Sequence, residues 1–221
     1  MSTVLVIAAH PDDEILGAGA TFAKHVDAGD DVHAVVLSEG ATARYEDTMT
    51  STLRDCAERS AAVIGFSSIE FLSMPDQRLD ALPLLEVTQS VESIVAGLGA
   101  QIIYTHNPSD VNSDHGVVAR ATWTACRPYA APSVRRLLAF DTPSSTEWAW
   151  PMTGSAFQPA WFVDVGATLQ RKLDAMACYE PELRDYPHPR SLRALAERAA
   201  YWGSVVGGTA VEPFVVLRNH A

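Results

Sequence analysis

Short apolar runs rich in β-branched residues alternate with longer helical patterns from residue 3 to residue 126 of this chain. The clearest run, 3–9 (TVLVIAA), is apolar throughout, which is typical of a strand buried on both faces of a parallel sheet. Parallel strands need crossover connections, and a helix-length segment follows each run. The sequence therefore predicts an α/β fold with a mostly parallel sheet flanked by helices. The expected strands are 3–9, 33–38, 69–72 and 101–105, and the expected helices are 12–28, 47–64, 84–98 and 114–126.

The pattern changes after Pro128, where a long loop rich in Pro, Ser and Trp (142–159) interrupts the alternation. No linker long enough to separate two domains is evident, so residues 1–221 are expected to form a single domain. The expected elements of this half are strands at 135–140, 161–165 and 214–217, and helices at 167–178 and 191–205.

The charge balance and the cysteines restrict the location and the partners. The 27 Asp and Glu residues outnumber the 16 Lys and Arg residues, which argues against a nucleic-acid partner. No apolar run approaches the ~20 residues of a membrane span, and the first residues lack the charge and length of a signal peptide. The three cysteines show no CxxC spacing, so neither a disulfide framework nor a cysteine zinc site is expected. We therefore expect a cytoplasmic protein without membrane insertion.

Metal-capable side chains follow the first strand directly, as His10-Pro11-Asp12-Asp13-Glu14. In open α/β sheets, ligands bind outside the carboxyl ends of the strands. A bend from strand to helix can aim the imidazole of His10 and the carboxylate of Asp13 at one point, and a bound cation would offset the repulsion between adjacent carboxylates. The alternative is that Asp12 or Asp13 caps the following helix and His10 is a surface residue.

A second polar segment, 106–115, follows the strand at 101–105 and ends in Asp114-His115. A histidine ligand is usually oriented through its other ring nitrogen by a carboxylate, which Asp114 can supply, although a helix cap is equally natural at Asp114. His10, Asp13 and His115 together have the composition of a catalytic zinc site. Asp12 would then be placed to take a proton from the attacking water.

The two clusters resemble the motifs of the PIG-L/LmbE-like zinc-dependent de-N-acetylases. His10 to Glu14, followed by Gly17 and Gly19, is similar to the opening signature of that family, and Asp110 to His115 is similar to its second metal motif. The similarity extends over nearly the full chain through segments 54–65, 75–79, 187–191, Gly203 and 212–214.

The resemblance implies a Rossmann-like fold, one zinc ion per chain and hydrolysis of an acetamide, usually on an N-acetylglucosamine unit. Residue by residue, it implies zinc ligation by His10, Asp13 and His115, and Asp12 as the general base. Glu14 is expected to stabilise the start of the helix or to hydrogen-bond to the ligands from outside the metal site, rather than to take part in the chemistry. Other divalent ions remain alternatives, because two histidines and a carboxylate also suit iron(II) and cobalt.

The chain departs from this family at Asn112, where several relatives carry a histidine that acts opposite the base. An asparagine can donate a hydrogen bond to a developing oxyanion but cannot deliver a proton, and losing a positioned acid costs roughly 10²–10⁴ in rate. We favour Asp12 in both proton transfers, with Asn112 polarising the carbonyl oxygen. His106 and His188 are the alternative acids.

Four residues are candidates for substrate contact, each beside a simpler explanation. The resemblance favours Arg54, which would otherwise pair with a neighbouring acid on a helix surface. Asp76 can accept hydrogen bonds from sugar hydroxyls or belong to a turn. His188 and Arg190 lie in a proline-flanked segment suited to a pocket rim, where Arg190 can meet a phosphate, although capping by Ser191 explains the segment equally well. The aromatic residues of the long loop either stack on sugars or cover the core: Trp148, Trp150, Phe157 and Trp161.

We therefore expect a zinc-dependent de-N-acetylase that acts on a small N-acetylglucosamine-type conjugate, such as a sugar nucleotide or a glycosylated small-molecule intermediate. One alternative is a zinc amidase acting on a non-sugar amide. Another is a metal-binding or sugar-binding protein with a decayed site, which Asn112 makes conceivable. A homo-oligomer is a further option, because relatives often assemble symmetrically.

Overall fold

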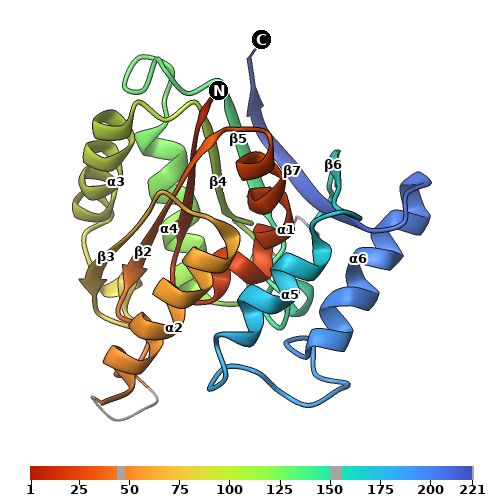
Figure 1. Cartoon of the computed structure of the whole chain (residues 1–221). Coiled ribbons are helices and arrows are strands. Elements are labelled where there is room, and N and C mark those ends of the chain that lie inside the picture. The colour runs from red at the N-terminus through yellow and green to blue at the C-terminus, as the bar shows by residue number, and fades with distance from the viewer. Residues whose placement is uncertain (44–47, 150–155, 221) are drawn as a thin grey trace.

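Five parallel strands form most of the sheet in a computed structural model, which describes residues 1–43, 48–149 and 156–220. The full sheet has seven strands in the order β3-β2-β1-β4-β5-β7-β6 (Figure 1). The α/β prediction with a mostly parallel sheet is confirmed. The parallel strands are β1 (Thr3–Ala8), β2 (Asp31–Ser38), β3 (Ser68–Met74), β4 (Ile102–His106) and β5 (Arg136–Phe140).

The last two strands reverse the local direction of the sheet. β7 (Val211–Asn219) lies between β5 and β6 (Trp161–Asp164) and is antiparallel to both. The final strand is therefore longer than the predicted 214–217, and it is inserted before β6 in the sheet although it follows β6 in the chain. The sequence pattern predicted the strand but not this exchange of order.

Helices cover both faces of the sheet (Figure 1). On one face α1 (Asp13–Asp27) packs against α2 (Thr48–Ile64) and α5 (Leu169–Ala177), and α6 (Leu192–Val206) packs against α5 and β7. The other face carries α3 (Leu84–Leu98) and α4 (Ser113–Ala125), which pack against each other. Two 3₁₀ turns, η1 (Leu79–Ala81) and η2 (Thr146–Trp148), lie in loops that lead toward the site.

Alternate residues of β1 enter two separate hydrophobic clusters. Val4 and Val6 pack in the cluster on the α1 face, whereas Leu5 and Ile7 pack in the cluster on the α3 face, and all four are fully buried. Each such side chain contributes roughly 1.5–3 kcal/mol on burial. This two-sided burial is why the run is apolar without alternation.

The strand order places a topological switch point between β1 and β4, because the chain proceeds from β1 outward to β2 and from β4 outward to β5. The carboxyl ends of these two neighbouring strands carry the His10 cluster and the 106–115 segment. Gly17 lets α1 approach β5, since a Cβ there would lie 2.3 Å from the ring of Phe140. The parallel sheet therefore brings the two polar clusters to one edge.

Among the described residues, the helices are too short or too polar to cross a membrane.

Candidate active site

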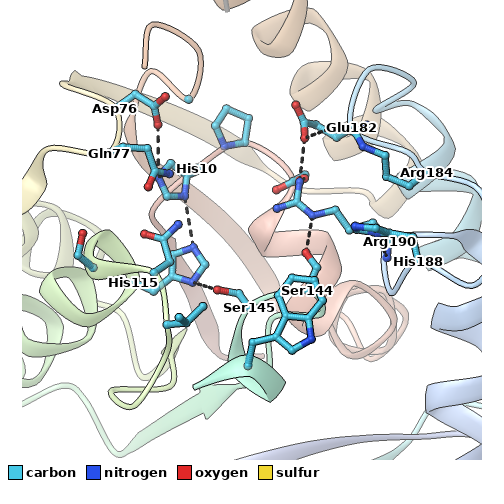
Figure 2. A pocket seen from close by; sticks show the side chains of 17 residues that line it. His10, Asp76, Gln77, His115, Ser144, Ser145, Glu182, Arg184, His188 and Arg190 are labelled. Atoms are coloured by element: carbon cyan, nitrogen blue, oxygen red, sulfur yellow. Dashed lines mark hydrogen bonds and ion pairs between the residues drawn. The ribbon is translucent and has the colours of Figure 1, made fainter. Parts of the chain in front are cut away.

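A cavity of about 630 Å³ opens at the carboxyl ends of β1 and β4 (Figure 2). Its walls come from segments far apart in the sequence. One wall contains His10, Asp76 and His115, and the facing wall contains His188 and Arg190, with two serines between them. The other lining residues include Asp12, Gln77, Asn112, Ser144, Ser145, Trp148, Glu182 and Arg184.

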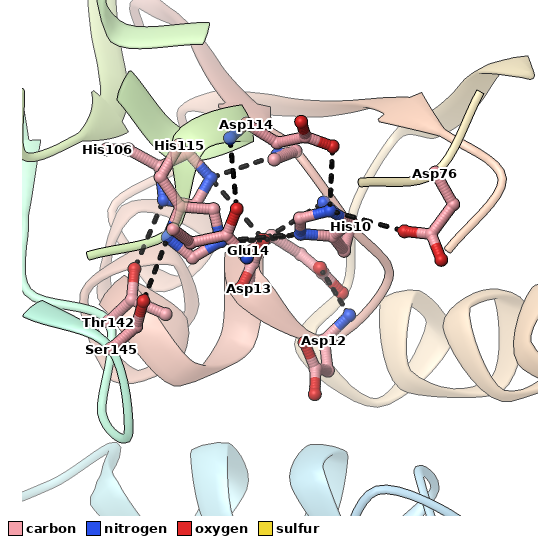
Figure 3. Close-up of polar contacts among 12 residues, drawn as sticks. His10, Asp12, Asp13, Glu14, Asp76, His106, Asp114, His115, Thr142 and Ser145 are labelled. Carbon is pink, nitrogen blue, oxygen red and sulfur yellow. Dashed lines mark hydrogen bonds and ion pairs between the residues drawn. The ribbon is translucent and has the colours of Figure 1, made fainter. Parts of the chain in front are cut away.

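Three donor atoms converge beside this cavity, where His10 and His115 line it and Asp13 lies behind them (Figure 3). Asp13 Oδ2 lies 3.2 Å from His10 Nδ1 and 3.2 Å from His115 Nε2, and these two nitrogens are 3.3 Å apart. Ligand atoms about 2.1 Å from a tetrahedral zinc ion would lie about 3.4 Å apart. Asp13 Oδ1 is buried and has no hydrogen-bond partner among the described residues. The donor set and its spacing therefore fit a divalent cation.

The charges of these three residues are strongly coupled. Burial alone would raise the pKa of Asp13, but the charge of His115 and the hydrogen bonds from His10 and His115 hold that pKa well below its usual range. Burial alone would lower the histidine pKa values, yet hydrogen bonds to Asp114 and Asp13 raise that of His10 to about 10. The charge and hydrogen bonds of Asp13 and Asp110 likewise raise the pKa of His115 to about 9. Without a cation, protons on the imidazoles balance the buried carboxylates.

Each histidine is oriented through its far nitrogen by a different carboxylate. His115 Nδ1 lies 3.2 Å from Asp110 Oδ2, and His10 Nε2 lies 3.2 Å from Asp114 Oδ2. Of the two alternatives for Asp114, orientation of His115 and a helix cap, the structure shows neither, because its carboxylate contacts His10 and the Leu79 amide and Asn112 caps α4. Asp114 and His115 are consecutive residues of α4, so their side chains diverge around the helix.

Asp110 is itself held in place by hydroxyl groups. Ser145 Oγ donates to Asp110 Oδ1, and Thr146 Oγ1 donates to Oδ2 at 2.7 Å. The sequence contained a signal for Asp110, because it stands five residues before His115 in the same polar loop, but we assigned it no role.

Asp76 and Gln77 close the other side of His10. Asp76 Oδ1 lies 3.4 Å from His10 Nε2, and its Oδ2 accepts the Ala43 amide at 3.2 Å. His10, Asp76 and Asp114 form a second group with metal-ligand geometry. Because both carboxylates and the Gln77 amide, at 3.1 Å, meet the same nitrogen, this group orients the ring of His10. Asp76 lines the cavity, but its carboxylate is engaged with protein atoms.

Asp12 occupies the N-cap position of α1 without capping it. Its φ is 102°, in the left-handed region, and its side chain makes no capping hydrogen bond. Oδ2 instead accepts Arg190 Nη1 at 3.0 Å. Burial raises the pKa of Asp12 well above its usual range, and the nearby Arg190 cation opposes this rise.

Glu14 lies behind this turn and does not line the cavity. It is fully buried, its Oε2 accepts the Asp12 amide at 3.1 Å, and its Oε1 accepts the Tyr179 hydroxyl. Burial raises the pKa of Glu14 to about 7. These contacts hold the backbone of Asp12 in its unusual conformation.

Asn112 lines the cavity and caps α4 at the same time. Its side-chain Oδ1 accepts the Asp114 amide at 3.0 Å. Because the cap occupies Oδ1, the side chain can offer its amide NH₂ as a hydrogen-bond donor to a ligand in the cavity.

The two alternative acids lie in different surroundings. His106 is fully buried: it accepts the Ala9 amide at 2.9 Å and stacks on His115 with ring centroids 4.0 Å apart. Burial lowers the pKa of His106 to about 3, so His106 is neutral where it stacks on His115. His188 lines the cavity, and its Nδ1 accepts the Arg190 amide at 3.1 Å, which leaves the proton of a neutral ring on Nε2.

Arg54 does not reach the cavity. It is exposed on α2, its guanidinium lies 4.6 Å from the ring centroid of Phe71, and it is absent from the described cavity lining. Trp148, more than half exposed, contributes its indole to the cavity wall. Phe157 packs against Trp202 instead, at a centroid distance of 6.4 Å. Trp161 lies in β6 beneath Arg136, and Trp150 lies outside the described residues.

Glu182 is one of the lining residues that sequence reasoning missed, together with Ser144, Ser145 and Arg184. It is buried in the segment between α5 and α6, and its Oε2 accepts Arg190 Nη1 at 2.8 Å. No motif marked it, because its partner Arg190 meets it, and through it Asp12, only in the folded chain.

Comparisons with known proteins agree with this geometry. A curated relative, the uncharacterized deacetylase YaiS of Escherichia coli K12, is 27% identical over 76% of this chain and 89% of its own. The N,N'-diacetylchitobiose deacetylase of Pyrococcus horikoshii has a TM-score of 0.80 at 20% identity, covering 98% of this chain and 84% of that one. The 4-carboxy-2-hydroxymuconate hydratase GalB of Pseudomonas putida has a TM-score of 0.77 at 19% identity, covering 100% and 98%.

The structural likenesses, both below 25% identity, show the shared fold. The family is shown by sequence, since the family model described as GlcNAc-PI de-N-acetylase (PIG-L) matches residues 5–126, more than half of the chain. That match contains the first cluster and the whole 106–115 segment. The chain thus belongs to the PIG-L family of de-N-acetylases.

Proposed function

We propose that this chain is a zinc-dependent de-N-acetylase that converts the acetamide of a small N-acetylglucosamine-type conjugate into an amine and acetate. The observation that carries the proposal is the convergence of His10 Nδ1, Asp13 Oδ2 and His115 Nε2, each 3.2–3.3 Å from the others, beside a cavity that the two histidines line in a PIG-L chain. Asp12, an acid outside this donor set, lines the same cavity.

The metal would be held by these three atoms, one from each residue. A zinc ion there would act as a Lewis acid toward the acetyl carbonyl and would acidify the attacking water. Asp110 and Asp114 would keep His115 and His10 in the orientation and tautomer that ligation requires.

The residues of the chain then carry the proton transfers. Asp12 accepts one proton of the water as the water oxygen attacks the acetyl carbon. The amide NH₂ of Asn112 donates to the carbonyl oxygen as its negative charge develops. Asp12 delivers its proton to the nitrogen as the C–N bond breaks, so that water and acetamide are consumed and acetate and amine are released.

The cavity supports a sugar conjugate as the substrate. Its volume of about 630 Å³ lies within the ordinary range for small-molecule sites. The half-exposed indole of Trp148 offers an aromatic face of the kind that stacks on sugar rings, and His188 offers a ring N–H to hydroxyl or acyl oxygens. Of the four predicted substrate contacts we retain His188, because Arg54 lies elsewhere and both Asp76 and Arg190 bond to protein groups.

We propose a cytoplasmic location and a homo-oligomeric assembly as expectations from the sequence. The free cysteines Cys56, Cys126 and Cys178 support a reducing compartment. Light scattering after size-exclusion chromatography tests the assembly, and a monomer at all concentrations would contradict it.

The test is release of acetate and free amine from a panel of N-acetylglucosamine conjugates and simple acetamides by the zinc-loaded protein. We expect turnover of at least one sugar conjugate and its loss in Asp12→Ala. Preference for simple acetamides would indicate an amidase for non-sugar substrates. Zinc binding without turnover would indicate a binding protein. A hydratase, as GalB is described, would add water without releasing acetate.

A further inference from the structure

Arg190 lines the cavity and forms an ion pair with Asp12, the proposed general base. Its Nη1 lies 3.0 Å from Asp12 Oδ2 and 2.8 Å from Glu182 Oε2, and its Nε lies 2.8 Å from Ser144 Oγ. Figure 2 shows the guanidinium between Glu182 and Ser144, on the wall that faces His10 and His115. Among the described residues, the side chain thus contacts Asp12, Glu182 and Ser144, which come from separate segments.

Asp12 depends on this contact for the orientation of its carboxylate. The residue is in a left-handed conformation and makes no capping hydrogen bond, so the helix does not fix its side chain. Among the described residues, Arg190 is the one hydrogen-bond donor to that carboxylate. Asp12 is also 2% exposed, so solvent offers little alternative.

Arg190 is itself fixed in position. The buried Glu182 holds Nη1 from the segment before α6, and Ser144 holds Nε from the loop after β5. Ser144, like Asp12, has a positive φ, at 71° against 102°. Such conformations persist where the surrounding structure over-determines them, and they cluster at functional sites. Asp12 and Ser144 are both hydrogen-bonded to Arg190.

We propose that Arg190, clamped by Glu182 and Ser144, is a positioning residue that aims the Asp12 carboxylate at the attacking water. This role rests on the proposed function and differs from the direct substrate contact expected from the sequence. A planar guanidinium suits the task, because its rigid geometry fixes the direction in which Nη1 meets Asp12 relative to the direction in which Nε meets Ser144.

The first test compares Arg190→Gln with Arg193→Gln in the zinc-loaded protein. Arg193 lies three residues further on, in the first turn of α6, but it is exposed, pairs with Glu197 and stacks on Tyr186, so its loss removes the same charge outside the cavity. Misplacement of a catalytic group by about 1 Å costs about 100-fold in rate. We expect Arg190→Gln to lower kcat about 100-fold, with KM and the zinc dissociation constant each within about threefold, and Arg193→Gln to match the wild type.

A folding defect in Arg190→Gln would also lower kcat, so two further variants, Arg190→Lys and Glu182→Gln, are measured. A lysine keeps the charge but cannot span Asp12 and Ser144 together, so we expect a kcat between those of the wild type and Arg190→Gln. Glu182→Gln should lower kcat while Asp12 and Arg190 remain in contact. If both variants have the melting temperature and the kcat of the wild type, the proposal that Arg190 positions Asp12 is wrong.

The second test places Arg190→Gln in an Asp12→Asn background. If Arg190 acts through Asp12, the double variant should have the kcat of Asp12→Asn alone. An equal further loss in that background, or a KM raised more than about tenfold with kcat retained, would overturn the proposal in favour of substrate binding.

Failure of the proposed function gives a distinct result. If neither the wild type nor Arg193→Gln hydrolyses any acetamide, the de-N-acetylase assignment fails, and crystal structures of the wild type and Arg190→Gln decide about Arg190. A reoriented Asp12 carboxylate in Arg190→Gln supports positioning, and an unchanged one overturns it.

Discussion

The Nδ1 atom of His115 lies 3.2 Å from Oδ2 of Asp110, a carboxylate that two hydroxyl groups also hold in place. This contact turns the other ring nitrogen, Nε2, toward Asp13 Oδ2 and His10 Nδ1. A loop residue five positions upstream, rather than the helix neighbour Asp114, therefore sets the direction of the candidate ligand.

Asp110→Asn tests that relationship. Loss of the carboxylate should weaken zinc binding about 10–100-fold, because outer partners of ligating histidines contribute that much to metal affinity. Isothermal titration with zinc measures the change. Asp80→Asn, an exposed acid on η1, is the matched control and should bind zinc as the wild type does. Equal affinities in all three proteins would show that Asp110 has no part in ligation.

Zinc binding should depend steeply on pH. In the metal-free protein the pKa of His10 is raised to about 10 and that of His115 to about 9, so both rings carry protons at neutral pH. Binding must displace them, so the affinity should rise as the pH rises toward 9 and fall below neutrality. Calorimetry at pH 7 in buffers of different ionisation enthalpy should show up to two protons released per zinc. Release of no protons would contradict this assignment.

The same raised pKa values affect stability in the absence of metal. A histidine with a raised folded-state pKa contributes stability below its unfolded pKa, about 6.5, and loses it as the pH rises through the folded value. The metal-free protein should therefore lose stability between about pH 7 and pH 10 relative to a His10→Gln variant. Urea unfolding at several pH values in the presence of a chelator measures the difference.

Asn112 combines two roles that substitution can separate. Asn112→Ala removes the α4 cap and should cost about 0.5–2 kcal/mol of stability, whereas Asn112→Ser keeps a capping oxygen and should melt near the wild type. Both variants lose the amide donor, so both should lower kcat about 10²–10³-fold if the amide meets the developing oxyanion. Unchanged kcat/KM in Asn112→Ser would remove Asn112 from the mechanism.

Gly17→Ala should destabilise the fold that carries the site. Its Cβ would lie 2.3 Å from the Phe140 ring, and overpacking of this kind costs about 1–3 kcal/mol. Gly97→Ala in α3 is the control, because nothing lies within 4 Å of its added Cβ and alanine is the better helix former by up to about 1 kcal/mol. Urea unfolding should shift in opposite directions for the two variants.

Local patterns predicted much of the fold and the centre of the site. The apolar run of β1, with Val4 and Ile7 fully buried toward opposite faces, required a strand inside a parallel sheet. The rule that parallel strands place their carboxyl ends at one edge then predicted that His10 and His115 meet, although 105 positions separate them. These inferences succeeded because they depend on periodicity and chain direction, which single segments contain.

The partners of individual side chains were not readable from the sequence. Asp114 was a candidate either to orient His115 or to cap the helix, but consecutive helix residues point apart, and Asp114 meets His10 instead. Arg54 was expected at the substrate, but its helix directs it onto Phe71. Which face of a helix a polar residue occupies is set by packing against other elements.

The sequence by itself determined the α/β class, the family resemblance and the two clusters that hold His10, Asp13 and His115, because burial periodicity and motif spacing are local properties of a chain. Only the tertiary structure decided that β7 enters the sheet before β6 and that the segment between α5 and α6 delivers Glu182 and Arg190 to Asp12. Those contacts span up to 178 residues, and they form because close packing of the whole domain brings the segments together.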